Sequence, residues 1–313
     1  MAWSRKDIFG IEGLSKEEIF TILKVSKYYK DSMKSKPAKN FTVLKGYIVI
    51  NMFFEASTRT RISFEVAEKR MGALSINFNV ALSSVKKGET FIDTIKTINA
   101  MHIDAIVIRH FDRGIPQLAK KYFDGSILNA GDGTHEHPTQ TLLDLLSMWE
   151  HIKSFEDLHV GIIGDILYSR VARSLIIGLK TLGAKVTLIG PPTLLPEYFR
   201  DWGVDIYYKL DDIIGELDVF YVYRIQKERA ELFKPTIPSI SEYAKLYRID
   251  ERRIKNAKKD FLVMHPGPAI RDSEVSTAVY DSERCLALDQ VTSGVAVRMA
   301  LLQLLLKGEI NNA

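Results

Sequence analysis

The chain alternates between short apolar segments and longer segments with helical periodicity, and it does so in both halves. The short segments are rich in β-branched and aromatic residues, a composition typical of buried strands. They are residues 47–54, 73–78, 105–108 and 126–130 in the first half, and 159–164, 185–189, 219–223 and 261–264 in the second. Helical spacing is found at residues 15–30, 91–101, 137–152, 170–182 and 291–306, and around Phe64, Ala67 and Met71. This alternation predicts an α/β fold with two doubly wound parallel-sheet domains.

The length of the chain also indicates more than one domain. With 313 residues, it exceeds the size at which a single hydrophobic core usually stops growing. We expect a first domain at residues 1–145, completed by the terminal helix at 292–313, and a second domain at 146–291. Ligands of such sheets bind at the carboxyl ends of the strands, so the active site is expected in the cleft between the two domains.

The composition excludes several classes of protein. With 46% hydrophobic and 26% charged residues, the chain is typical of soluble proteins. No run approaches the roughly 18 apolar residues of a membrane span, and the first residues lack the apolar core of a signal peptide. A net charge of +4 is too balanced for a nucleic-acid binder. The single cysteine, Cys285, fits a reducing compartment. We therefore expect a cytoplasmic protein that binds neither nucleic acid nor membranes.

The most informative polar segment follows the first predicted strand. The apolar run ends at Phe54 and gives way to Ser57, Thr58, Arg59 and Thr60, which fall where a strand turns into a helix. The first N–H groups of a helix lack intrahelical partners, and the helix dipole adds positive charge there, so anions bind well. The hydroxyls and the Arg59 fork suit phosphate oxygens. The alternative is that the hydroxyls only cap the helix and the arginines are solvated.

Other polar groups fall at the ends of predicted strands. Arg109 follows the strand at 105–108 and is expected beside the Ser57 turn if the two strands are neighbours. The alternative for Arg109 is a surface ion pair. Arg170 and Arg224 follow strands of the second half and, with Gln226, suit a dicarboxylate. For each arginine taken alone, solvation at the surface is an equally good interpretation.

Two further patterns favour structural interpretations. His135 and His137 lack a third ligand at a recognisable spacing, so we do not expect a metal site. The strand end from Gly161 to Asp165 lacks the third glycine of a dinucleotide-binding turn, which argues against a nicotinamide cofactor. Lys86 and Lys87 lie in a polar loop that either is solvated or brings a cation to a phosphate.

Six segments taken together resemble the aspartate carbamoyltransferase catalytic chain family. They are FFEASTRTRISFE at 53–65, SSVKKGET at 83–90, HPTQTLLDL at 137–145, GDILYSR at 164–170, YRIQKER at 223–229 and HPGP at 265–268. The resemblance spans nearly the whole chain, in the family's order. It implies transfer of the carbamoyl group of carbamoyl phosphate to the amine of L-aspartate, a step of pyrimidine synthesis, with no metal or organic cofactor.

The resemblance also implies roles for individual residues. Carbamoyl phosphate would be bound by Ser57, Thr58, Arg59, Thr60, Arg109, His137 and Gln140, with the backbone of Gly267 and Pro268 at the carbamoyl end. Aspartate would be held by Arg170, Arg224 and Gln226. The family forms homotrimers, in which Ser83 and Lys87 would reach the neighbouring subunit's site and Lys87 would contact both substrates. The catalytic groups would be Arg59, Thr60, Lys87, Arg109 and His137.

The sequence also bears on two alternatives to this activity. An ornithine carbamoyltransferase shares the phosphate motif, but its cysteine-containing HCLP motif is replaced here by HPGP. A catalytically silent assembly subunit is disfavoured because every proposed ligand is present. Leu167 stands where many relatives have a polar residue, and Gly267 replaces a leucine, but neither change removes a ligand. The sequence does not determine whether a regulatory chain or a dihydroorotase binds the trimer.

Overall fold

The computed structural model describes residues 3–78, 88–152, 154–225 and 239–308. Its chain divides into two compact units, Met1–Leu146 with Val291–Ala313, and Ser147–Gln290. No helix of the described residues is both long enough and apolar enough to span a membrane.

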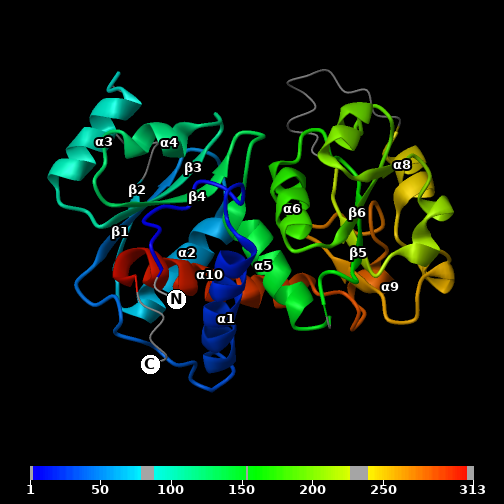
Figure 1. Cartoon of the computed structure of the whole chain (residues 1–313), viewed down its shortest axis with the longest axis horizontal. Helices are drawn as coiled ribbons and strands as arrows, with labels where there is room; N and C mark the ends of the chain where they lie inside the picture. The colour runs from blue at the N-terminus through cyan, green and yellow to red at the C-terminus, as the bar shows by residue number, and fades with distance from the viewer. Residues whose placement is uncertain (1–2, 79–87, 153, 226–238, 309–313) are drawn as a thin grey trace. The chain divides into compact units, whose positions relative to one another are not determined.

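A parallel sheet forms the centre of the first unit. The described strands pair in the order β2-β1-β3-β4. Figure 1 shows α3 and α4 on one side of this sheet and α2 and α10 on the other, so the doubly wound prediction is confirmed for this unit. The elements are α1 (Lys16–Ser32), β1 (Ile48–Phe53), α2 (Thr58–Met71), β2 (Leu74–Phe78), α3 (Phe91–Ala100), β3 (Ala105–His110), α4 (Ile115–Lys120), β4 (Ser126–Asp132), α5 (Pro138–Trp149) and α10 (Ala287–Lys307).

Local signals account for the ends of the first helices. At the start of α1, Ser15 and Glu18 form the capping box that their spacing predicts, each side chain bonding the backbone of the other residue. At the end of α2, Gly72 adopts a left-handed conformation with φ of 82°, which glycine tolerates at little cost. The chain then turns back into β2, which pairs with β1 in parallel.

The second unit contains another parallel sheet, with the described strands in the order β7-β6-β5-β8-β9. Helix α6 lies on one side of it and α8 on the other (Figure 1), which again is a doubly wound arrangement. The elements are β5 (His159–Ile163), α6 (Arg170–Thr181), β6 (Lys185–Ile189), η3 (Glu197–Trp202), β7 (Asp205–Tyr207), η4 (Leu210–Asp212), η5 (Ile214–Glu216), β8 (Val219–Val222), α8 (Ile240–Tyr247), η6 (Ile254–Asn256), β9 (Leu262–Met264) and α9 (Thr277–Tyr280).

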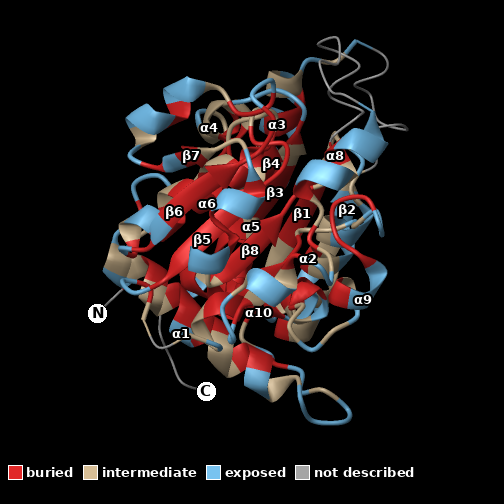
Figure 2. Ribbon diagram, turned by 90° about the vertical axis from the view of Figure 1, so that its right-hand side faces the viewer, coloured by how far each residue is buried: buried red, intermediate tan, exposed pale blue. Residues whose placement is uncertain are grey.

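Helices as well as strands contribute to the core of each unit, and the strands lie at its centre. Figure 2 shows the strands largely buried, with exposed residues on the outer faces of the helices. The edge strand β2 differs, because Leu74 and Ile76 are exposed. In β5, Gly161 is required by packing, since a Cβ there would lie 2.5 Å from Leu217 Cδ1 and 3.1 Å from Ile189 Cδ1. This glycine therefore has a structural reason that is independent of any nucleotide.

Candidate active site

The candidate site of the first unit lies where the strand order reverses. β1 and β3 are neighbours, which is the condition for placing Arg109 beside the Ser57 turn, and Phe53 pairs with Arg109 near their carboxyl ends. The backbone N–H of Phe54 donates to Arg109 O at 2.8 Å, so the chain leaving β1 is held beside β3. The helices that follow these two strands, α2 and α4, lie on opposite sides of the sheet (Figure 1). In doubly wound sheets, this switch point is where ligands bind.

The turn that follows β1 leaves the N-terminus of α2 able to receive an anion. Ser57 occupies the N-cap position, but its side chain makes no capping hydrogen bond, and no acidic residue lies in the first turn. Thr58 and Arg59 are exposed, and Thr60 is half-buried. The alternative is therefore wrong for the Ser57 hydroxyl, which does not cap the helix, whereas the exposure of Arg59 and Arg61 is what that alternative expects. Backbone N–H groups, hydroxyls and a guanidinium are instead gathered at one helix end.

Arg109 lies beside this turn, and a carboxylate holds its side chain in place. Its Nη2 donates to Glu55 Oε1 at 3.2 Å, and the Arg109 side chain is 13% exposed. Arg109 thus forms an ion pair, as the alternative interpretation allowed, but it is too buried to be a solvated surface residue. Its positive charge lies at the carboxyl end of β3, next to the anion-receiving turn.

An acidic residue at the end of β4 shapes the loop that leads to His137. Asp132 Oδ1 accepts from Asn129 Nδ2 at 2.8 Å and from the Glu136 N–H at 3.2 Å. Asp132 Oδ2 accepts from the Gly114 N–H at 2.8 Å and contacts His135 Nδ1 at 3.1 Å. Burial opposes ionisation of Asp132, but these hydrogen bonds outweigh it and lower its pKa. Asp132 also raises the pKa of His135.

These contacts give His135 and Glu136 structural roles. The Glu136 carboxylate accepts from the backbone N–H groups of Ile11 at 2.9 Å and Glu12 at 3.1 Å. Within the described part of the chain, no three His, Cys, Asp or Glu side chains are grouped to hold a metal ion. Sequence reasoning missed Asp132 and Glu136 as anchors of this loop, although acidic residues directly after a buried strand are a usable signal.

His137 and Gln140 lie at the start of α5, which follows β4. His137 is buried, and Gln140 Nε2 donates to Asp144 Oδ1 at 3.0 Å, one helical turn further along. Because the sheet places β4 next to β3, these residues share the carboxyl edge of the sheet with Arg109 and the Ser57 turn. The structure thus brings the described phosphate-site candidates of the first unit to one edge.

The second unit has its own switch point, between β5 and β8. The Tyr223 N–H donates to Ile163 O at 2.8 Å, which holds the ends of the two strands together. Arg170 begins α6 beside the N-cap Ser169 and is only 3% exposed, so solvation at the surface is wrong for this arginine. Arg224 directly follows β8 and is half-buried, with its Nη1 donating to Ile225 O at 3.3 Å.

The HPGP segment after β9 is held by a buried pair. His265 Nδ1 accepts from the Gly267 N–H at 2.8 Å, so Nε2 carries the proton that faces Glu274 Oε1 at 3.2 Å. The same Glu274 oxygen accepts from the Ile270 N–H at 2.7 Å. Gly267 has a φ of 66°, which suits glycine better than the leucine expected there. His265 and Glu274 therefore hold in place the loop that contains Gly267 and Pro268.

Ser83, Lys86, Lys87 and Gln226 lie outside the described residues. The residues of the first unit and those of the second are each gathered at the edge of their own sheet, and the cleft between the two domains stays a prediction.

The buried carboxyl of Glu68 connects α2, the helix that begins at the anion-receiving turn, to the sheet. Glu68 Oε2, on α2, accepts from Asn51 Nδ2 at 2.8 Å and from the Ser75 hydroxyl. Burial raises the pKa of Glu68 from 4.5 to about 7. Because the folded-state pKa is raised, the stabilisation linked to this proton is complete below the unfolded pKa. It is lost as the pH rises through the folded pKa.

We expect Glu68→Gln, which cannot ionise, to remove this pH dependence. Between about pH 5 and about pH 8, the free energy of unfolding of the unmodified chain should fall by about 2–3 kcal/mol relative to that of the variant. Urea unfolding of both proteins across this range measures the difference. Parallel pH profiles for the two proteins would show that Glu68 does not titrate with a raised pKa.

Comparison with known proteins agrees with this architecture. Residues 6–150 match a family model described as the aspartate/ornithine carbamoyltransferase carbamoyl-P binding domain, and residues 156–305 match the Asp/Orn binding domain. The aspartate carbamoyltransferase catalytic subunit of Desulfitobacterium hafniense (strain DSM 10664 / DCB-2) is 47% identical over 308 residues, covering 98% of each chain. That of Moorella thermoacetica is 46% identical, covering 98% of this chain and 99% of the other.

Solved structures are similar along nearly the whole chain. Aspartate transcarbamoylase from Trypanosoma cruzi, in complex with carbamoyl phosphate and aspartate, has a TM-score of 0.84 and 32% identity, covering 96% of this chain and 95% of that chain. The catalytic subunit of M. Jannaschii aspartate transcarbamoylase has a TM-score of 0.82 and 35% identity, covering 96% and 98%. The resemblance in the motifs is thus confirmed, and the chain belongs to the aspartate/ornithine carbamoyltransferase family.

Proposed function

We propose that this protein transfers the carbamoyl group of carbamoyl phosphate to the amine of L-aspartate, giving N-carbamoyl-L-aspartate and phosphate for pyrimidine synthesis. The observation that carries the proposal is the anion-receiving turn at Ser57–Thr60 beside the partly buried Arg109. The identity of 47% with an aspartate carbamoyltransferase catalytic subunit supports the same activity. A solved relative in complex with carbamoyl phosphate and aspartate supports these substrates.

Carbamoyl phosphate binds in the first unit in this proposal. Its phosphate accepts hydrogen bonds from the N-terminal turn of α2 and from the hydroxyls of Ser57 and Thr58, and Arg59 supplies charge. Thr60, Arg109 and His137 serve the carbamoyl oxygen. Gln140 accepts from the carbamoyl amino group, and the backbone at Gly267 and Pro268 completes that end.

Aspartate binds through cationic groups of the second unit. Arg170 begins α6, the helix after β5, and Arg224 follows β8, the neighbour of β5. Their two planar forks match the two carboxylates of aspartate. Gln226 and Lys87 complete this set in the proposal. Two carboxylate-binding arginines favour aspartate over ornithine, whose side chain ends in an amine.

The reaction follows from these positions. The amine nitrogen of aspartate attacks the carbamoyl carbon, and negative charge develops on the carbonyl oxygen, where Thr60, Arg109 and His137 stabilise it. The bond from carbon to the phosphate oxygen then breaks, and the leaving phosphate takes the proton lost by the amine. Because no side chain of the proposed set is placed as a general base, positioning and electrostatic stabilisation supply most of the rate enhancement.

The proposed assembly is a cytoplasmic homotrimer with shared active sites. In it, Ser83 and Lys87 of the segment SSVKKGET reach the site of the neighbouring subunit, as the resemblance to the family implies. A chain of this kind has no complete site as a monomer.

One assay tests the proposed activity. We expect the purified protein, given carbamoyl phosphate, to carbamoylate L-aspartate at least about ten times faster than L-ornithine. The reason is that an unpaired alkylamine beside two arginines is strongly disfavoured. Release of phosphate and formation of the carbamoylated amino acid are both measured. Equal or reversed preference for ornithine would refute the assignment, and failure to turn over either substrate would favour a silent assembly subunit.

A further inference from the structure

A buried arginine on the C-terminal helix lies behind the candidate phosphate site. Arg298, on α10, is 3% exposed. Its guanidinium lies over the ring of Phe64, with 4.9 Å between the guanidinium carbon and the ring centroid. A fully buried cation is costly unless its surroundings compensate for lost hydration. Packing alone therefore does not account for an arginine at this buried position.

The hydrogen bonds of Arg298 join the two helices whose first turns carry the phosphate-site residues. Its Nη1 donates to Ser63 Oγ on α2 at 2.9 Å, and its Nη2 donates to Thr139 Oγ1 on α5 at 3.5 Å. Ser63 lies three residues after Thr60, and Thr139 lies directly before Gln140. One guanidinium thus links the second turn of α2 to the first turn of α5.

Asp144 extends this arrangement to Gln140. Asp144 is buried and attracts the Arg298 guanidinium, which opposes the effect of burial on the arginine. Burial still lowers the pKa of Arg298 to about 9, so the group remains protonated at neutral pH. Because Gln140 Nε2 donates to Asp144 Oδ1 at 3.0 Å, the end of the amide that Gln140 offers to a ligand is its oxygen.

The helix that carries Arg298 leaves room for the guanidinium. Gly294 lies one turn before Arg298, and a Cβ at this position would come 2.6 Å from Arg298 Nη1. It would also come 3.1 Å from Leu143 Cδ2. Any side chain at position 294 therefore forces Arg298 Nη1, the nitrogen that bonds Ser63, to shift. The glycine is otherwise unfavourable inside a helix, by about 1 kcal/mol relative to alanine.

We propose that Arg298 is a positioning residue for the anion pocket: it joins Ser63 and Thr139 and, with Asp144, orients the amide of Gln140. This inference rests on the proposed function, in which the first turns of α2 and α5 bind carbamoyl phosphate. Arg298 acts through these residues and does not itself touch the substrate. Removing the Arg298 guanidinium should therefore weaken binding of carbamoyl phosphate much more than binding of aspartate.

Two variants test the role of Arg298. Arg298→Lys keeps the positive charge but loses the planar guanidinium that bonds two partners at once. Gly294→Ala keeps Arg298 but displaces its guanidinium, while the alanine favours the helix. For each variant, we expect the Kd for inorganic phosphate, measured by calorimetry, and the KM for carbamoyl phosphate to rise about tenfold. The KM for aspartate, measured at saturating carbamoyl phosphate, should change less than about threefold.

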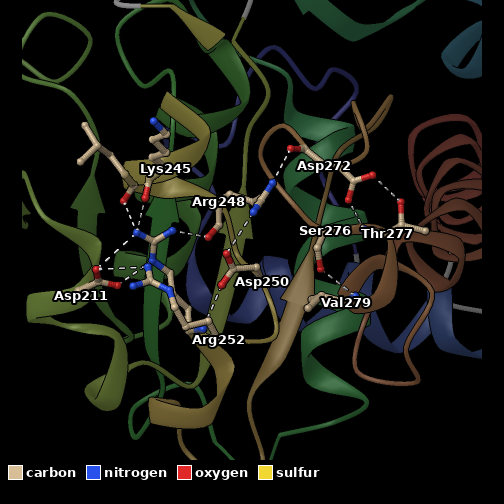
Figure 3. A network of polar contacts seen from close by, with 11 residues as sticks. Asp211, Lys245, Arg248, Asp250, Arg252, Asp272, Ser276, Thr277 and Val279 are labelled. Atoms are coloured by element: carbon tan, nitrogen blue, oxygen red, sulfur yellow. Dashed lines mark hydrogen bonds and ion pairs between the residues drawn. The ribbon is translucent and has the colours of Figure 1, made fainter. Parts of the chain in front are cut away.

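Arg253 in the second unit offers a matched control. It is also 3% exposed, and it donates to Asp211 Oδ1 at 2.7 Å and to the carbonyl oxygens of Arg248 and Lys245 at 2.7 and 2.8 Å. Figure 3 shows the network around Asp211, Arg248 and Asp250. Arg253→Lys therefore breaks a comparable fork in the same chain, at a position that our proposal does not connect with phosphate. We expect the Kd for phosphate of this control to stay within about twofold of the unmodified chain.

The outcomes separate this inference from the proposed function. Weakened phosphate binding in Arg298→Lys and Gly294→Ala, but not in Arg253→Lys, supports the positioning role. Unchanged phosphate binding in both test variants, or equal weakening in the control, overturns it. If Arg298→Lys does not fold, Gly294→Ala decides alone. Failure of the unmodified protein to carbamoylate aspartate refutes the proposed function, while phosphate binding still tests Arg298. If the unmodified protein binds no phosphate, the positioning role is overturned as well.

Discussion

Replacing Arg109 with alanine is expected to reduce kcat for the carbamoylation of L-aspartate by about 100- to 1000-fold, the usual cost of removing one donor to a developing oxyanion. The guanidinium lies at the carboxyl end of β3 beside the Ser57 turn. It is mostly shielded from water, which strengthens its interaction with developing charge. Its Nη2 donates to Glu55, so a substrate oxygen competes with that carboxylate for the same donor.

The fall in kcat has to be separated from a loss of folding. The Glu55 side chain is 28% exposed, so water can partly solvate its carboxylate once Arg109 is removed, and stability should change only modestly. Circular dichroism and thermal unfolding check this directly. Arg113→Ala is the matched control, because Arg113 is an exposed arginine on the loop that follows β3, and its kcat should stay within about twofold. A well-folded Arg109→Ala protein with a kcat within about threefold of normal would remove Arg109 from the mechanism.

Mixing two inactive variants, Lys87→Ala and Arg59→Ala, should restore activity if the sites are shared between subunits. A working site needs Arg59 from one chain and Lys87 from its neighbour. In trimers formed at random from equal amounts, roughly one quarter of the sites combine both intact residues. We therefore expect roughly one quarter of the normal activity per site from a mixture of two variants that are each nearly inactive.

A second mixture distinguishes shared sites from sites within one chain. When the double variant Arg59→Ala/Lys87→Ala is mixed equally with unmodified chain, shared sites again leave roughly one quarter of the sites intact, whereas sites within one chain leave roughly one half. Mass spectrometry of the mixed trimers confirms that subunits have exchanged. Absence of recovery in confirmed mixed trimers of the two single variants would exclude a shared site.

Elements with strong local signals were predictable from sequence. The capping box at Ser15 and Glu18 forms as its spacing predicts, since both partners lie within one helical turn. The strand at 185–189 is found with the same bounds, and other predicted strands differ only by a few residues at their ends. Helix α10 begins at Ala287 instead of at residue 291. The six-residue helix α4 was missed because it is too short to show a period.

The sequence alone determined the alternation of strands and helices, and with it the doubly wound class. It also placed the hydroxyls and arginines that follow the strands, because those signals lie within a few residues of one another. Only the tertiary structure decided that β1 and β3 are neighbours and that Glu55 holds Arg109. It also revealed Arg298, whose partners Ser63 and Thr139 are 235 and 159 residues away in the chain. No local pattern reports such contacts, because the folding of the whole unit brings these residues together.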